Sequence, residues 1–226
     1  MKKWLILCLV AFIPMLTAVD RKWEKYKQKV LIQQKSVPGW CVYEKANKLM
    51  DLIHETNPEV VVEIGVFGGS SAYPMAEALR YQNHGVLYAM DPWKAEDCQV
   101  GYEPDDPNYI WWTTVDLEKI YKDFTKLIKN NHLSNFCTIM RTTSLEAVAQ
   151  FADESIDILH VDGNHTEDSA FTDVSLFLPK VKSNGYIWFD DVNWSSTSKA
   201  VSYLLERCTF LPMRSVRDEC YLFQKL

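Results

Sequence analysis

Two short apolar runs, each ending abruptly in acidic residues, constrain the fold of this chain more than any other feature. The runs are Ile156–Val161 and Tyr186–Phe189, and they are followed by Asp162 in the first case and by Asp190 and Asp191 in the second. Apolar runs of this length that stop at turn-forming or polar residues are typical of buried strands.

The segment between these two runs has the spacing of a helix. Ala170, Val174, Phe177 and Leu178 recur at intervals of three and four, and Pro179 follows them. An Asn-Gly pair then leads into the second run, as expected for a turn. Strand, helix and strand in this order predict a parallel βαβ unit.

The acidic residues at the two strand ends are expected to meet. In a parallel sheet the carboxyl ends of neighbouring strands lie side by side, and ligands bind in the crevice beyond them. Asp162, Asp190 and Asp191 repel one another there unless a cation or a shared proton compensates their charge. Single acids at strand ends often serve as loop residues or helix caps. Three at adjacent ends favour a site for Mg²⁺, Ca²⁺ or Mn²⁺, which prefer oxygen ligands.

Length and charge limit the fold and its partners. A chain of 226 residues accommodates one α/β domain with a substantial core. Its net charge of −6, without a basic stripe, argues against nucleic acid as the main partner. A small or neutral substrate is expected instead.

Residues 1–19 are predicted to be a signal peptide or an uncleaved membrane anchor. Lys2 and Lys3 precede a long uncharged stretch, as in a signal peptide, but Pro14 interrupts this stretch and it is short for a spanning helix. The cations that follow oppose export. Residues 20–39 are therefore expected to form a cationic tether, in a protein that either associates with a membrane through residues 4–19, facing the cytosol, or is exported.

The cysteines leave the compartment open. No C-x-x-C pair occurs, so zinc and redox motifs are absent from the sequence. Cys208 and Cys220 flank a predicted C-terminal hairpin and would be able to pair after export. Buried free thiols are the alternative that we prefer.

A glycine-rich turn follows the first predicted strand of the domain. Residues Glu59–Gly69 read as a buried parallel strand that runs into a tight turn, and a helix over Ala72–Tyr81 follows. Backbone N–H groups at such a turn face a bound ligand, and glycine lets the chain pass close to it. The pattern is E-x-G-x-x-x-G and not the dinucleotide motif G-x-G-x-x-G, so a pyrophosphate is not implied. The next strand, Gly85–Pro92, ends at Asp91, where a ribose diol is held in such sheets, or where an Asp-Pro turn forms.

An aromatic and acidic segment without periodicity spans residues 93–114. Loops of this length in a compact domain are usually functional or disordered. Tyr102, Tyr109, Trp111 and Trp112 would be costly to leave exposed. They predict either a lid or pocket wall for an apolar or aromatic substrate, or a cover over the core.

The remaining segments complete the predicted sheet. A helix over Asp116–Asn130 precedes a strand over Phe136–Met140, and Ser144 follows at its polar end. The Ser144 hydroxyl is predicted to bond a base edge or to cap the next helix. Residues Thr209–Val216 and Cys220–Lys225 predict the hairpin that closes the sheet.

Five segments together resemble a known family. EIGVFGGSS, MDPW, RTTS, HVDGNH and WFDD, in this order within residues 40–226, resemble the class I S-adenosylmethionine-dependent methyltransferases, closest to the metal-dependent O-methyltransferases of the catechol and macrocin types. The resemblance implies an α/β fold with a single Rossmann-like, doubly wound, mostly parallel sheet and a C-terminal antiparallel hairpin strand. It implies S-adenosylmethionine as cofactor and a hydroxyl of a small molecule or sugar as methyl acceptor.

The same resemblance implies roles for individual residues. The implied contacts to the methionine end of the cofactor are Glu63, Gly65, Gly69 and Ser71, with Asp91 for the ribose and Ser144 for the adenine. The implied ligands of Mg²⁺ or another hard divalent cation are Asp162, Asp190 and Asp191.

His165 stands where the catechol-type enzymes place a lysine base. A histidine of near-neutral pKa accepts a proton from a metal-bound hydroxyl, so a role as catalytic base is expected. A fourth metal ligand or a helix cap is the alternative.

Two other functions fit a similar sheet. An NAD(P)-dependent reductase is disfavoured by the glycine spacing and because the Tyr221–Lys225 pair of a Tyr-x-x-x-Lys pattern falls in the terminal strand. A non-enzymatic exported binding protein is the other alternative, since S-adenosylmethionine is a cytosolic metabolite. The sequence does not define an oligomeric state.

Overall fold

The computed structural model describes residues 16–213 and 219–226. The strands of this part of the chain are β1 (Val60–Ile64), β2 (Val86–Asp91), β3 (Cys137–Arg141), β4 (Ile156–Val161), β5 (Val181–Asp190), β6 (Cys208–Leu211) and β7 (Cys220–Lys225). The α-helices are α1 (Leu16–Gln34), α2 (Tyr43–Thr56), α3 (Ala72–Gln82), α4 (Ala95–Cys98), α5 (Pro107–Thr114), α6 (Leu117–Asn130), α7 (Ser144–Ala147), α8 (Glu167–Phe177) and α9 (Ser198–Leu205). Short 3₁₀ turns lie at Val148–Gln150 (η1), Leu178–Lys180 (η2) and Ser195–Thr197 (η3).

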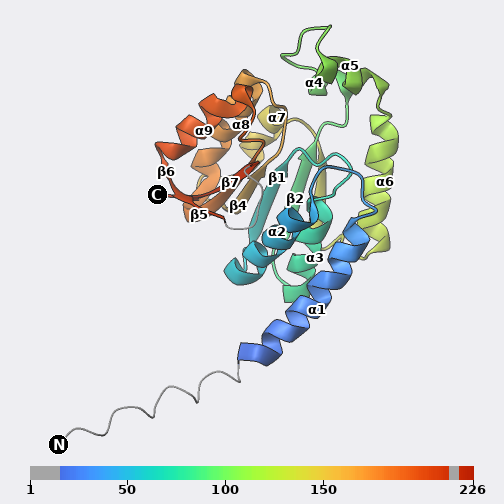
Figure 1. Ribbon diagram of the computed structural model, residues 1–226, viewed down its shortest axis with the longest axis vertical. Coiled ribbons are helices and arrows are strands. Elements are labelled where there is room, and N and C mark those ends of the chain that lie inside the picture. The colour runs from blue at the N-terminus through green and yellow to red at the C-terminus, as the bar shows by residue number, and fades with distance from the viewer. Residues whose placement is uncertain (1–15, 214–218) are drawn as a thin grey trace, which may run out of the picture.

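The strands form one sheet in the order β3-β2-β1-β4-β5-β7-β6 (Figure 1). Strands β1 to β5 pair in parallel, β7 is antiparallel to β5, and β6 is antiparallel to β7. This confirms the predicted doubly wound, mostly parallel sheet with a C-terminal hairpin. The strand order reverses between β1 and β4, which is where such sheets open a crevice for ligands.

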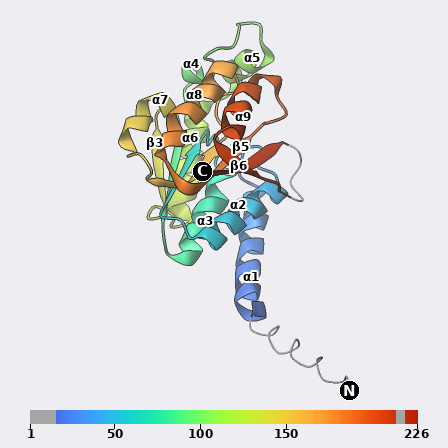
Figure 2. The ribbon, with the colours of Figure 1, turned by 90° about the vertical axis from the view of Figure 1, so that its left-hand side faces the viewer.

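Helices cover both faces of the sheet, so its central strands are buried on both sides. Val61 belongs to a core shared with α1, α2, α3 and α6, whereas Val62 belongs to a second core shared with α8 and α9. Successive side chains of a strand point to opposite faces, which explains why β1 is apolar almost throughout. Glu63 is the exception within this strand. The two views place α4 and α5 at one end of the molecule and the start of α1 at the other (Figures 1 and 2).

Helix α1 is packed into the fold, although residues 20–39 were expected to be a tether. Trp23 is buried, stacks on His54 with ring centroids 4.2 Å apart, and donates from Nε1 to Asp51 at 2.9 Å. Lys27, also buried, donates to the same Asp51 carboxylate. The apolar and polar contacts of α1 therefore belong to the domain.

The predicted signal peptide or anchor falls mostly outside the described residues. Residues 1–15 are not among them, and residues 16–19 form the start of α1. In the described ranges, no helix is both long enough and apolar enough to cross a membrane.

The aromatic segment 93–114 contains two short helices that its lack of periodicity did not predict. Helix α5 begins because Asp106 caps it: the carboxylate accepts a hydrogen bond of 2.7 Å from the Asn108 N–H, and Pro107 occupies the first turn. Likewise, the helix predicted after β3 divides into α7 and η1, and Thr143 and Glu146 form a capping box at its start.

The cysteines of the described residues are free thiols. Cys208 pairs in register with Lys225, whereas Cys220 pairs with Asp190, so they lie at opposite ends of the hairpin. A disulfide between them is excluded by this register, and the preferred prediction of buried thiols is confirmed for both.

A buried carboxyl joins helices α7 and α8. Asp173, on α8, is 5% exposed and accepts a hydrogen bond from the Ser144 hydroxyl. Burial raises the pKa of Asp173 to about 6, although the hydrogen bond from Ser144 acts in the opposite direction.

Trp23→Ala tests whether α1 is part of the domain. Loss of a buried, hydrogen-bonded indole should lower the free energy of unfolding by about 3 to 5 kcal/mol in urea denaturation. Ile32→Ala, on the exposed face of the same helix, should change it by less than about 0.5 kcal/mol. A similarly small effect of Trp23→Ala would mean that α1 is a detached tether.

The buried carboxyl of Asp173 should make stability depend on pH. Because its native pKa is raised, the native state binds this proton more tightly, and the free energy of unfolding should fall as pH rises from about 4 to about 6. In Asp173→Asn this contribution, on the order of 2 to 3 kcal/mol, should disappear from urea denaturation series at pH 4 and 7. Asp168→Asn, an exposed change on α8, should retain the wild-type slope. A wild-type slope in Asp173→Asn as well would contradict the assignment.

Candidate functional site

The acidic residues predicted to meet do lie together at the carboxyl ends of β4 and β5. Potential ligand atoms of Asp162, His165 and Asp191 lie within 4.8 Å of one another, and so do those of His160, Asp162 and Asp190. The parallel pairing of β4 with β5 brings these two strand ends to the same edge of the sheet.

The glycine turn after β1 lies directly against the first of these acids. Gly65 has a φ of +87°, and a Cβ there would lie 1.9 Å from the backbone oxygen of Asp162. Only glycine satisfies both the backbone angle and the close approach. The predicted cofactor turn and the predicted metal turn are therefore in backbone contact. Gly69, also predicted to contact the cofactor, has a φ of +89° and faces the ring of Phe124.

Asp91 fastens the glycine turn to the end of β2. One of its oxygens accepts from the N–H groups of Val66 and Phe67 at 3.1 and 2.9 Å, and the other accepts from Trp93 at 2.7 Å. Burial raises the pKa of this carboxyl, although the three backbone hydrogen bonds oppose that shift. A carboxylate oxygen accepts about two hydrogen bonds, so Oδ1 has room for one more donor.

Glu63 is a fully buried acid with one unused oxygen. Its Oε1 accepts a hydrogen bond from the Ser71 hydroxyl and lies 3.0 Å from His160 Nδ1. Its Oε2 is buried and has no hydrogen-bond partner among the described residues. Buried carboxylate oxygens are almost always paired, so this oxygen is an unsatisfied acceptor that a ligand donor would satisfy.

Asp190 is already held by donors of the protein. Its Oδ2 accepts from Lys45 Nζ at 2.9 Å and lies 3.0 Å from His160 Nε2, while Trp188 donates to Oδ1 at 3.3 Å. Burial alone would raise the pKa of Asp190, but His160 and Lys45 outweigh it and lower the pKa to about 2.

The partners of Asp190 have raised pKa values, and both remain cationic. Burial alone would lower the pKa of His160, but hydrogen bonds to Asp190 and Glu63 raise it to about 10. Burial alone would also lower the pKa of Lys45, but the charges of Asp190 and Asp162 outweigh burial and raise it.

Sequence reasoning missed Lys45 and His160, although each carries a signal. Lys45 stands on the apolar stripe of α2, one residue before Ala46 and four before Leu49. His160 interrupts an apolar run in a strand that is buried on both faces. A titratable residue in an apolar pattern indicates an internal partner, because burying its charge alone is costly.

Asp162, Asp191 and His165 form the more open part of the cluster. Burial raises the pKa of Asp162, and the charge of Asp190 adds to the shift, although Lys45 opposes it. His165 Nε2 lies 2.7 Å from Asp191 Oδ2 but lacks the alignment of a hydrogen bond, and this buried atom has no other partner within the part of the chain that the structure describes. An imidazole nitrogen and carboxylate oxygens that converge on one point are donor types found in divalent-cation sites, and a protonated His165 would form an ion pair with Asp191 in the same place. The ring of Trp194 lies 4.7 Å from that of His165.

Ser144 lies beyond β3 at the same edge of the sheet, as expected for an adenine contact. Its hydroxyl donates to Asp173, and the helix cap is its neighbour Thr143. The Ser144 oxygen therefore keeps its lone pairs for a donor from a ligand.

The aromatic segment is fastened to the turn that carries His165. The Asn164 side-chain amide donates to the backbone oxygens of Cys98 and Val100 at 3.1 and 2.9 Å. Further along the segment, Trp111 contacts Phe67 of the glycine turn and Trp40, with ring centroids 5.8 and 5.4 Å apart. An aromatic wall therefore stands beside the cofactor turn, with Trp40 64% exposed.

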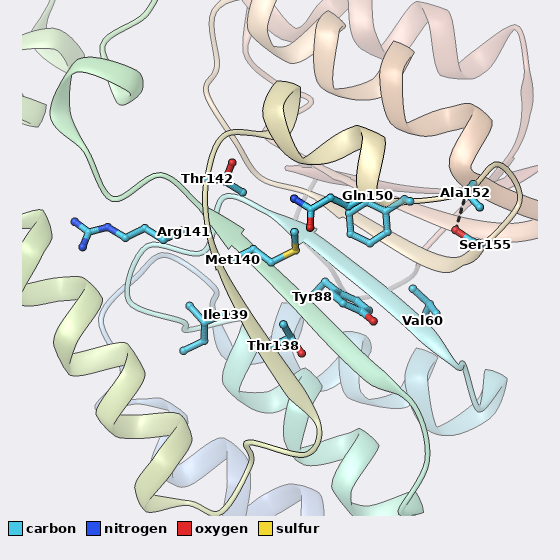
Figure 3. Close-up of a pocket in the computed structure, with 11 residues that line it drawn as sticks. Val60, Tyr88, Thr138, Ile139, Met140, Arg141, Thr142, Gln150, Ala152 and Ser155 are labelled. Carbon is cyan, nitrogen blue, oxygen red and sulfur yellow. Dashed lines mark hydrogen bonds between the residues drawn. The ribbon is translucent and has the colours of Figure 1, made fainter.

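A separate cavity of about 620 Å³ lies on the sheet face at the β3 edge (Figure 3). Tyr88 and Met140 come from its strands, and Gln150 of η1 lies over them (Figure 3). None of the predicted site residues lines this cavity. The predicted site residues therefore lie at the strand ends and not in this cavity.

Comparisons with known proteins agree with this architecture. A family model described as a methyltransferase domain matches residues 62–192, more than half of the chain. An SAH-bound methyltransferase, PaMTH1, of Podospora anserina superimposes with a TM-score of 0.63 at 14% identity, over 98% of this chain and 100% of that one. An O-methyltransferase of Bacillus cereus in complex with SAH has a TM-score of 0.63 at 14% identity, over 93% and 97% of the two chains.

The curated relatives are themselves uncharacterised. A protein of Acanthamoeba polyphaga mimivirus is 32% identical over 133 residues, which are 58% of this chain and 50% of that protein. The chain matches only 14% and 50% of the lengths of the curated relatives found. The family assignment rests on the domain model, and it confirms the enzyme class predicted from the sequence: the chain belongs to this family of methyltransferase domains.

Proposed function

We propose that this protein transfers the methyl group of S-adenosylmethionine to a hydroxyl of a small molecule, with a divalent cation at the acidic cluster. The observation that carries the proposal is that two buried atoms without a hydrogen-bond partner, Glu63 Oε2 and His165 Nε2, belong to β1 and to the turn after β4, at strand ends that are in backbone contact. The Glu63 oxygen would accept a hydrogen bond from an ammonium group, and the His165 nitrogen would coordinate a metal cation. The SAH-bound state of the Podospora anserina and Bacillus cereus structures supports the cofactor.

The cofactor site is proposed at the turn after β1. Glu63 Oε2 is placed to accept from the ammonium group of the methionine moiety, and the remaining capacity of Asp91 Oδ1 suits a ribose hydroxyl. Gly65, Gly69 and Ser71 shape the turn, and Ser144 offers an acceptor to the adenine amino group. The family's cofactor supplies an electrophilic methyl group; these residues bind and orient it.

The cation is proposed to bind to Asp162, Asp191 and His165. This set keeps two of the three predicted acids and replaces Asp190, whose oxygens accept from Lys45, His160 and Trp188. His165 thereby becomes a ligand and not the base. When bound, a divalent cation would lower the pKa of a coordinated hydroxyl, so that the acceptor could release its proton to bulk water on binding, before water is excluded from the site. Two oxygens and an imidazole nitrogen suit Mn²⁺ better than Mg²⁺.

The acceptor is proposed to be a small apolar or aromatic molecule with a hydroxyl. Trp111 and Phe67 provide a wall beside the cofactor turn, and Trp194 flanks His165. These rings exclude water from the reacting groups, which favours a transfer step in which opposite charges neutralise.

Calorimetric titration of the full chain with S-adenosylhomocysteine (SAH) tests the cofactor site. Wild type should bind with a micromolar dissociation constant, and Glu63→Gln should weaken binding at least about tenfold, because a charge-assisted hydrogen bond is lost. Glu77→Gln, which changes another buried acid outside the site, should leave the affinity unchanged. Binding of NADH in place of SAH would contradict the proposal and favour a reductase.

Titration of EDTA-treated protein with Mn²⁺ and Mg²⁺ tests the ligand set. We expect tighter binding of Mn²⁺, and a loss of affinity of at least about tenfold in Asp162→Ala and His165→Ala, since each removes a direct ligand. Both variants should bind SAH normally in EDTA, and His84→Ala should behave as wild type. Unchanged Mn²⁺ affinity in His165→Ala, combined with slower methyl transfer, would return His165 to the role of base.

A further inference from the structure

Four buried titratable side chains form a continuous chain beneath the crevice. Oε1 of Glu63 lies 3.0 Å from Nδ1 of His160, and Nε2 of His160 lies 3.0 Å from Oδ2 of Asp190. The same Asp190 oxygen accepts from Lys45 at 2.9 Å. Solvent does not reach the Glu63, His160 and Asp190 side chains, and Lys45 is 8% exposed.

The sheet itself holds this chain in register. Glu63 and His160 are directly paired across β1 and β4, and His160 is paired with Trp188 across β4 and β5. Asp190 stands two residues after Trp188, so its side chain lies on the same face. The imidazole of His160 is thus a rigid spacer between an acid of β1 and an acid of β5.

The charges of the chain balance. With both carboxyl groups ionised, each ring nitrogen of His160 faces an acceptor oxygen, so the ring would donate from both nitrogens as an imidazolium. Together with Lys45 it gives two cations against two anions. Removing one member leaves an uncompensated buried charge, which is strongly unfavourable.

Each end of the chain adjoins one of the proposed binding sites. At one end, Glu63 offers Oε2 to the ammonium group of the cofactor. At the other end, Asp190 is bonded to Asp191, a proposed cation ligand whose backbone has a φ of +55°. Aspartate adopts this left-handed conformation more readily than most residues, and the bonds of Asp190 to His160 and Lys45 hold the preceding residue in place.

From this geometry we infer that His160 is a positioning residue that couples the cofactor site to the cation site, so that each ligand strengthens binding of the other. The inference rests on the proposed function. A cofactor ammonium on Oε2 would shift the Glu63 carboxylate, and the rigid imidazole of His160 would pass that shift to Asp190 and to the backbone that presents Asp191. The position that one ligand sets is then already in place when the second ligand binds, which gives positive coupling. By thermodynamic linkage the coupling is equal in both directions.

Calorimetry on the full chain measures this coupling. SAH is titrated in EDTA and in saturating Mn²⁺, and Mn²⁺ is titrated with and without SAH. In wild type, saturating Mn²⁺ should raise the affinity for SAH at least about fivefold, and SAH should raise the affinity for Mn²⁺ by the same factor. His160→Gln, which cannot donate to both carboxylates, should bind each ligand while the gain falls below about twofold. Trp188→Phe removes a different donor to Asp190 but leaves the bridge, so it should keep the wild-type gain.

The outcomes separate this inference from the proposed function. If wild type fails to bind SAH or Mn²⁺, the proposed function is wrong and the coupling falls with it. If wild type binds both with no mutual gain, or if His160→Gln keeps the full gain, only the coupling is overturned. Where thermal unfolding shows that His160→Gln does not fold, ¹⁵N NMR of the wild-type imidazole with diamagnetic Mg²⁺ decides: SAH-induced shifts of His160 that change when Mg²⁺ is bound support the coupling, and SAH-induced shifts that are the same with and without Mg²⁺ overturn it.

Discussion

The backbone contact between the turn after β1 and the turn after β4 is the constraint on which the candidate site depends. Gly65 lies against the oxygen of Asp162, with no room for a side chain between them. This contact exists because β1 and β4 are neighbours at the point where the strand order reverses. The proposed cofactor turn and the acidic cluster are therefore adjacent, and a methyl donor and an acceptor proposed to bind to them would lie side by side.

A second constraint is that charged side chains buried in the sheet must be paired with opposite charges or hydrogen-bond partners. Glu63, His160 and Asp190 lie where neighbouring residues are apolar, and such groups are tolerated only when their hydrogen bonds and charges are matched. Lys45 supplies the matching cation from the first turn of α2. The free-energy cost of burying these charges falls at the site where ligands are proposed to bind. The apolar cores on the two faces of the sheet supply the stability that offsets it.

The sequence predicted the sheet and the position of its functional edge because both follow from local patterns. Apolar runs that stop at Asp91, Asp162 and Asp190 identify strand ends, and the parallel connection brings those ends together. The packing of α1 was not predicted, because its interior contacts include polar ones, such as those of Trp23 and Lys27 to Asp51, and its exposed cations resemble those of a tether.

The different environments of the three aspartates were also not predicted from the sequence. Three aspartates look equivalent in the sequence, but Asp190 is separated from the others by Lys45, a partner 145 positions away along the chain. The spacing of apolar residues in helices and strands does not reveal a pairing between residues so far apart in the chain. His165 was identified from its position, whereas its unpaired nitrogen beside Asp191 is visible only in three dimensions.

Asn164 connects the aromatic segment to the turn that carries His165. Its amide holds the carbonyls of Cys98 and Val100, while its Oδ1 accepts from the Thr166 N–H at 2.8 Å, so one side chain pins both the aromatic segment and the turn that carries His165. The position of the aromatic segment and the conformation of the histidine turn therefore depend on the same side chain, so a change at Asn164 affects both at once.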